Sequence, residues 1–163
     1  MPTSTQTATR KTATRHLPTP DGATVRSWLS VVRAYHLCDA VLARRLGALG
    51  VKTPEHEILA NLRREPGITQ QTLAGRCFSA KSHISGLLTA LEERGWVQRE
   101  PDPADARAKR LFLTAAGARM AERTAAVQAQ VVATMANALT PEQMAQVTDA
   151  MQRLCESLQT LLD

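Results

Sequence analysis

Apolar residues recur at helical spacing over most of the chain. Between about Val25 and Leu49 they fall three or four positions apart, which places them on one face of a helix, and Gly50 ends the pattern. The members of this stripe are Trp28, Val32, Tyr35, Leu42, Leu46 and Leu49. The pattern therefore predicts one long helix near the N-terminus.

Capping residues predict two shorter helices after the first. Thr53 is a favourable N-cap residue with Pro54 at the first helical position, and Pro66-Gly67 should end that helix. Thr69 is then expected to cap a short helix of about two turns.

A fourth helix is expected between Ser79, its N-cap, and Gly95, its stop signal. Its apolar side is an i, i+3, i+4, i+7 stripe made of Ile84, Leu87, Leu88 and Leu91. The opposite side carries small residues instead of the usual mixture of Glu and Lys, namely Ser82, Ser85, Gly86 and Thr89. Such a face lets the helix backbone approach another surface closely, and its hydroxyl groups can bond phosphates or base edges.

The period then changes from helix to strand. "WVQRE" and "RLFLT" are the only convincing strand candidates, and they flank the polar segment "PDPADARAK", so they predict a hairpin. Thr114 should cap a long Ala-rich helix to about Asn137, and Thr140 with Gln143 forms a capping box for a last helix. The expected fold is mainly α with one short β-hairpin.

Composition and charge narrow the function classes. The net charge is +5, the pI is about 9.6, and residues 61–110 carry nine Lys or Arg against six Asp or Glu, which suggests a polyanionic partner. No apolar run is long enough to span a membrane, and the N-terminus lacks a secretory signal, so a cytoplasmic location is expected. Three widely spaced cysteines and four scattered histidines fit neither a disulfide framework nor a metal site. No nucleophile–base pair or phosphate loop is recognisable, so the chain is not expected to be an enzyme or to hold a cofactor.

The small polar face fits a helix-turn-helix whose second helix enters the major groove of DNA. The hairpin directly after it makes this a winged version. Arg107, Lys109 and Arg110 near its tip suit phosphate or minor-groove contact, and Lys81 adds charge near the start of the helix. Arg94 and Arg99 are expected to pair with Glu92, Glu93 or Glu100, and they are therefore left out of the DNA-binding set.

The segment from Ile68 to Gly117 resembles the winged helix-turn-helix of the multiple-antibiotic-resistance-regulator (MarR) family. The wing signature of that family, Asp-Pro-x-Asp-x-Arg followed by a basic pair and Leu-Thr-x-x-Gly, is present as Asp102, Pro103, Asp105, Arg107, Lys109, Arg110, Leu113, Thr114 and Gly117. The resemblance extends over about Trp28 to Leu162, because the flanking helices occupy the positions of the family's dimerisation helices.

The resemblance implies a homodimeric transcriptional regulator, most commonly a repressor, on a pseudo-palindromic double-stranded operator. Residues 1–24 would be a disordered basic leader and residues 25–163 one MarR-type domain, with the winged helix-turn-helix at about 53–114 and dimerisation helices at about 25–49 and 115–162. Arg107 would enter the minor groove and Asp105 would orient it. The DNA-binding set on the recognition helix and the wing is Ser79, Lys81, Ser82, His83, Ser85, Thr89, Asp105, Arg107, Lys109 and Arg110.

The resemblance also implies release of DNA by a small, often phenolic or aromatic, anion that binds between the dimerisation helices and the DNA-binding lobe. The candidate pocket residues are Trp28, Val32, Tyr35, His36, Asp39, His56 and Glu57. The aromatic members also fit a core or dimer interface, and the histidines also fit the surface. Urate and salicylate- or nicotinate-like rings remain open as effectors.

Two other functions remain open. Cys38 or Cys77 could make the protein a thiol-based redox-sensing repressor, although a lone cysteine more often serves as a small apolar residue. The winged helix could also be a protein-interaction module without DNA binding. The cations of the predicted wing, Arg107 above all, favour DNA.

Overall fold

The computed structural model of the protein describes residues 19–77, 81–103 and 108–162, without the side chain of Lys81. The chain divides into two units, Met1–Tyr35 and His36–Asp163, each of which is described by itself. The first helix, α1 (Gly22–Gly47), begins in the first unit and ends in the second. The predicted leader falls mostly outside the described residues and stays a prediction.

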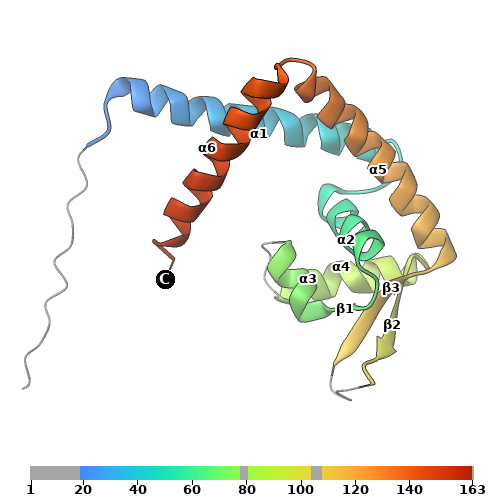
Figure 1. Ribbon diagram of the computed structural model, residues 1–163. Helices are drawn as coiled ribbons and strands as arrows, with labels where there is room; N and C mark the ends of the chain where they lie inside the picture. The colour runs from blue at the N-terminus through green and yellow to red at the C-terminus, as the bar shows by residue number, and fades with distance from the viewer. Residues whose placement is uncertain (1–18, 78–80, 104–107, 163) are drawn as a thin grey trace, which may run out of the picture. The chain divides into compact units, whose positions relative to one another are not determined.

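The second unit contains the other elements, and apart from β1 they follow the expected order (Figure 1). They are α2 (Thr53–Arg64), β1 (Ile68–Thr69), α3 (Gln70–Arg76), α4 (Lys81–Glu93), β2 (Val97–Pro101), β3 (Lys109–Leu113), α5 (Ala115–Ala136) and α6 (Pro141–Gln159). The predicted fold class, mainly α with a β-hairpin, is therefore confirmed.

The hairpin is part of a three-stranded antiparallel sheet in the order β1-β3-β2. Its register runs from Val97 opposite Leu113 to Pro101 opposite Lys109. The two arms of the hairpin each lie within one residue of the predicted segments "WVQRE" and "RLFLT". The sequence analysis missed β1, in which Ile68 lies opposite Leu111. Two residues are too few to show an alternating pattern in the sequence. The strand forms because it can pair with the free edge of β3.

Capping chemistry sets the starts of the helices, with one correction. The predicted caps Thr69, Thr114 and Thr140 are confirmed, because each hydroxyl accepts a bond from a backbone N–H of the first turn. Thr53, however, is not the N-cap of α2. Lys52 holds that position, and its backbone N–H donates to Oε2 of Glu55 at 2.9 Å. The start of α2 is therefore capped by the carboxylate of its third residue, Glu55, and not by a hydroxyl group at the N-cap position.

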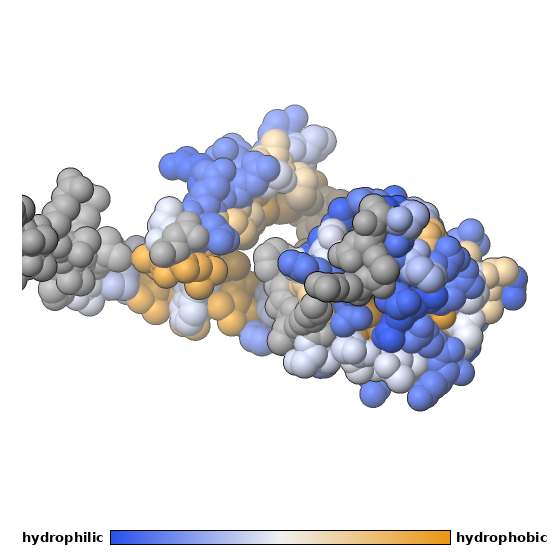
Figure 2. Space-filling view, turned by 90° about the horizontal axis from the view of Figure 1, so that it is seen from below, coloured by the Kyte–Doolittle hydropathy of each residue, from blue (hydrophilic) through white to orange (hydrophobic). Residues whose placement is uncertain are grey.

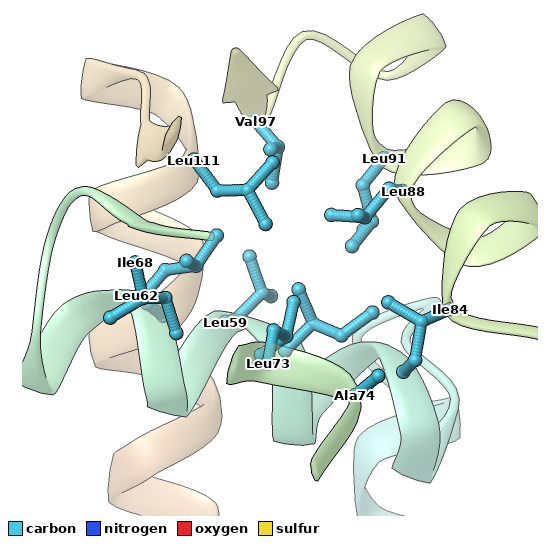
Figure 3. Packing of buried hydrophobic residues seen from close by; sticks show 12 residues of the cluster. Leu59, Leu62, Ile68, Leu73, Ala74, Ile84, Leu88, Leu91, Val97 and Leu111 are labelled. Atoms are coloured by element: carbon cyan, nitrogen blue, oxygen red, sulfur yellow. The ribbon is translucent and has the colours of Figure 1, made fainter. Parts of the chain in front are cut away.

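The aliphatic stripe of α4 lies at the centre of the core (Figure 3). Ile84, Leu88 and Leu91 are almost fully buried, and Leu87 is half-buried at the edge of the cluster. They pack with buried residues of α2, β1, α3, β2, β3 and α5, namely Ile58, Leu59, Leu62, Ile68, Leu73, Ala74, Val97, Leu111 and Ala121. Each large aliphatic side chain buried in this way contributes about 1.5–3 kcal/mol. The stripe predicted from the sequence is confirmed.

The start of α5 is fastened to the turn between α4 and β2. The backbone N–H of Thr114 donates to the carbonyl of Trp96 at 3.0 Å, and its hydroxyl donates to the carbonyl of Gly95 at 2.6 Å. Gly117 lies so close that a Cβ there would stand 1.8 Å from the carbonyl oxygen of Trp96. Only glycine fits at this position.

The long helices carry exposed apolar residues. On α5 and α6 these include Val132, Met135, Val147, Leu154 and Leu158, and no residue of α6 is buried. On α1 the residues Val25, Trp28, Leu29, Val31 and Tyr35 are exposed, and Figure 2 shows hydrophobic surface in orange. Each of these long helices therefore presents apolar side chains at its surface.

Gly117→Ala should destabilise the protein, since the added methyl group collides with backbone that cannot swing away. We expect a loss of about 1–3 kcal/mol in the free energy of unfolding, measured by urea denaturation. Gly75→Ala in α3 is the matched control, because a Cβ at Gly75 meets no atom within 4 Å. The control should be neutral or stabilising by up to about 1 kcal/mol. Equal effects of the two changes would contradict the close approach at Gly117.

Candidate nucleic-acid interface

The outer face of α4 is exposed and small. Ser82, His83, Gly86 and Thr89 are exposed, and Ser85 is half-buried. The hydroxyl of Thr89 donates to the backbone carbonyl of Ser85 at 3.1 Å, so part of its hydrogen-bonding capacity is used within the helix. A Cβ at Gly86 would meet nothing within 4 Å. The packing of the chain therefore does not require a glycine there.

Two parts of the predicted DNA-binding set lie outside the described residues. These are Ser79, Asp105 and Arg107, together with the side chain of Lys81. Their proposed contacts rest on the sequence alone.

The remaining cations of the wing lie next to each other at the start of β3. Lys109 is exposed at the start of β3. Arg110 next to it donates from Nε to Oδ2 of Asp102 at 2.8 Å, and the backbone N–H of Asp102 bonds the carbonyl of Ala108 at 3.1 Å. The Arg110–Asp102 pair thus joins the two arms of the hairpin. Arg110 has a structural partner that the sequence analysis did not assign to it.

The two arginines left out of the DNA-binding set have different partners. Arg99 pairs with Glu92, with 3.4 Å between Nη1 and Oε2, as expected. The expected partner of Arg94 was wrong, because its guanidinium reaches Oε2 of Glu55 in α2 at 3.3 Å. Sequence neighbours gave no sign of this contact, which spans 39 positions.

A pocket of about 270 Å³ adjoins the winged lobe on the other side of α2 from its core-facing residues. It is lined by Leu42, Thr53, His56, Glu57, Ala60, Asn61, Arg64 and Gln128. Of the predicted ligand residues it contains His56 and Glu57, whereas His36 and Asp39 are exposed and do not line it. Trp28, Val32 and Tyr35 belong to the first unit and are not placed against the pocket.

His56 is the most unusual lining residue. It is only 2% exposed, and neither ring nitrogen makes a hydrogen bond of good geometry within the described chain. Burial lowers the pKa of His56, although the Gln128 side chain opposes the shift. Burial therefore favours the neutral form of this imidazole.

Carboxylates near the pocket repel each other. Burial, and next the charge of Asp39, raise the pKa of Glu57. Burial, and next the charge of Glu57, also raise the pKa of the Cys77 thiol, which lies 3.8 Å from Nδ2 of Asn61. A thiol with a raised pKa holds little thiolate, the form that reacts with oxidants.

Asn61, Arg64 and Gln128 are among the polar lining residues that were not predicted. Asn61 and Arg64 follow His56 and Glu57 at helical spacing on the same face of α2, so the periodicity could have identified them. Gln128 comes from α5, and nothing in the sequence pairs it with α2.

Among the described residues, no group of three or more His, Cys, Asp or Glu side chains is arranged to hold a metal ion. No helix within 19–77, 81–103 and 108–162 is both long and apolar enough to cross a membrane.

Comparisons with known proteins agree with this geometry. Residues 51–109 match the model of the MarR family. The transcriptional regulator HosA of Escherichia coli O111:H- is 38% identical over 64 residues, which are 39% of this chain and 47% of HosA. The chain thus spans about half of the length of this relative.

Solved structures extend the likeness to the long helices. Sco3205, a MarR family transcriptional regulator from Streptomyces coelicolor solved in complex with DNA, superposes with a TM-score of 0.82 at 28% identity, over 89% of this chain and 93% of that one. AbsC, a MarR family transcriptional regulator from the same organism, gives a TM-score of 0.82 at 23% identity, over 88% and 99%.

The match therefore covers the winged lobe in sequence and nearly the whole chain in structure. The two lines of comparison agree with the wing signature and with the buried stripe of α4. Residues 51–109 thus resemble the MarR family in sequence, and nearly the whole chain is similar in fold to MarR family transcriptional regulators.

Proposed function

We propose that the protein is a DNA-binding transcriptional regulator, a homodimeric repressor that a small aromatic anion releases from its operator. The observation that carries the proposal is the outer face of α4, which is exposed, polar and small on a helix whose other face is anchored in the core. A helix of this kind fits a major groove because its backbone can come close to the bases. The relative Sco3205, which was solved with DNA, supports this assignment.

Charge supports the same partner. Residues 61–110 include the helix-turn-helix and the wing, and they carry a net positive charge. Residues 111–163 carry a net negative charge. A polyanion would therefore meet the lobe first. The wing supplies Lys109 in an exposed position and, from the sequence, Arg107.

A second copy of the chain is the partner that best explains the exposed apolar faces of α1, α5 and α6. Apolar surface of this extent is rarely left in water, and most soluble oligomers are symmetric dimers of one chain. Two recognition helices related by a twofold axis would require two half-sites, and hence a pseudo-palindromic operator.

The pocket beside α2 is the proposed effector site. Arg64 supplies a cation for a carboxylate or phenolate, and the neutral imidazole of His56 can donate or accept a hydrogen bond. Its volume suits a single substituted ring. The raised pKa of the Cys77 thiol makes this cysteine a poor redox sensor, so the thiol-based alternative has less support.

Binding to DNA from upstream of the protein's own gene, with scrambled DNA beside it, tests the proposal. Fluorescence anisotropy at several salt concentrations should give sequence-preferring binding with a steep salt dependence. Arg107→Ala should make the slope of log K against log salt shallower, by up to about 0.9, because one cation at the DNA surface is lost. Arg153→Ala, which removes an equal charge from the exposed surface of α6, is the matched control. A folded dimer that binds no DNA at low salt would overturn the proposal in favour of a protein-interaction module.

Enlarging Gly86 should separate DNA binding from stability. Gly86→Ala should raise the free energy of unfolding by up to about 1 kcal/mol, because alanine favours the helix and nothing lies near the new methyl group. Gly86→Leu should weaken operator binding about tenfold or more while non-specific binding at low salt persists. Operator affinity that is unchanged by leucine would show that this face does not approach DNA.

Binding of an aromatic anion should strengthen as the pH falls from about 7.5 to about 5.5. Because its pKa is raised, Glu57 takes up a proton at a higher pH than an ordinary glutamate does, and it then no longer repels the anion. The pKa of His56 is lowered, so His56 gains a positive charge that attracts the anion only at a lower pH than an ordinary histidine does. Isothermal titration with sodium salicylate should show about a threefold or larger decrease in Kd. Glu57→Gln should flatten this dependence. A Kd that rises with falling pH, or an unchanged slope in the variant, would contradict the assignment of Glu57.

A further inference from the structure

Arg94 holds three separate parts of the lobe together. It lies in the turn between α4 and β2, directly after the last helical residue. Its Nη2 donates to the carbonyl of Gly50 at 2.8 Å, and its Nη1 donates to Oε2 of Glu55 at 3.3 Å. The centre of its guanidinium lies 3.6 Å from the centroid of the Trp96 ring. One side chain thus connects the end of α4 with the α1–α2 loop, the first turn of α2 and the start of the wing.

The partners of Arg94 are themselves fixed. Glu55 is 6% exposed, and the same carboxylate oxygen accepts the backbone N–H of Lys52 at 2.9 Å. Gly50 lies in a tight turn between the buried residues Leu46 and Val51, with φ at +67°. An arginine that bonds a nearly buried carboxylate and a backbone carbonyl is held far more firmly than one in an exposed ion pair.

The same turn is also tied to α5. The carbonyls of Gly95 and Trp96 accept the two hydrogen bonds from Thr114 at the start of that helix. The turn of residues 94–96 is therefore the place where the end of α4 is joined both to the loop that follows α1 and to the beginning of α5. In the proposed dimer, α1 and α5 lead to the partner.

We propose that Arg94 is a positioning residue for operator recognition. It fixes the C-terminal end of α4 relative to the α1–α2 loop and the first turn of α2, and so sets the distance between the two recognition helices of the dimer. This inference rests on the proposed function. The aliphatic stripe of α4 holds the helix against the core, and Arg94 adds the directional contacts that a layer of leucines cannot supply.

Half-site spacing is the property that Arg94 should control. A dimer discriminates between operators of different spacing only if its two recognition helices cannot shift relative to each other. Loosening the turn should leave each helix able to enter a groove while widening the range of spacings that the dimer accepts. Phosphate contacts, and with them non-specific affinity, should change little beyond the loss of one charge.

The experiment compares Arg94→Gln with Arg99→Gln in the full-length protein. Both variants lose one positive charge and one ion pair with a glutamate, but the Arg99–Glu92 pair joins only β2 to α4 and does not reach the α1–α2 loop. The operator is first selected from random duplexes with the wild-type protein. Its half-sites are then moved apart or together by one or two base pairs, and affinity for each duplex is measured beside scrambled DNA.

Wild type and Arg99→Gln should prefer the selected spacing. Arg94→Gln should lose about fivefold or more of this preference, with affinity for scrambled DNA like that of Arg99→Gln. Equal weakening at every spacing, or an unchanged preference, would overturn the inference while leaving the proposed function intact. A wild-type protein that selects no operator would overturn both the inference about Arg94 and the proposed function. That result would be known before any variant is made.

A second pair of variants covers the case in which Arg94→Gln does not fold. Arg94→Lys retains the charge but lacks the planar guanidinium, which bonds its two acceptors from separate nitrogens. Glu55→Gln keeps an oxygen for the backbone N–H of Lys52 while losing its charge. Both should reduce the spacing preference partially. Wild-type preference in both variants would overturn the inference.

Discussion

The burial of one aliphatic stripe on α4 is the constraint on which the rest of the structure depends. Because Ile84, Leu88 and Leu91 must be covered, α4 can turn only its opposite face outward. α2, α3 and the sheet supply that cover, and their own orientations follow from it. The exposed polar face is thus as firmly defined as the core, although no contact of its own holds it in place.

Hydrogen bonds at helix starts convert this packing into a definite geometry. A layer of leucines tolerates small rotations, whereas a threonine hydroxyl or a capping carboxylate accepts a bond from one direction only. Thr114 is the clearest case, since it caps α5 and bonds the turn before β2 at the same time. The close approach of Gly117 to Trp96 then leaves no room for the helix to slide.

The sequence predicted whatever depends on local pattern. Each feature that the structure confirms depends on a few neighbouring residues. These features are the stripe of α4, the caps Thr69 and Thr114, and the two arms of the hairpin. The cap of α2 was misassigned because Thr53 is a good N-cap by type, whereas a carboxylate already satisfies the N–H of Lys52. β1 was missed because its existence depends on β3, more than forty positions later.

The residues of the candidate site also fall into two groups, those that local sequence predicts and those that it does not. Exposed residues of α4 follow from helical periodicity, as do Asn61 and Arg64 beside the pocket. Other parts of the site join segments that are far apart in the chain. Arg94 pairs with Glu55, and His56 and Gln128 line the same pocket. Local sequence holds no record of such pairs, because they are consequences of how the helices pack.

The absence of buried residues in α6 makes the amount of protein a thermodynamic variable. A helix of 19 residues without tertiary support is only marginally stable in water, so most of its stability must come from whatever covers its apolar side. If that cover is another copy of the chain, dilution weakens the fold as well as the assembly. Newly made chains at low copy number would then be open to proteolysis, and the lifetime of the protein would rise with its own abundance.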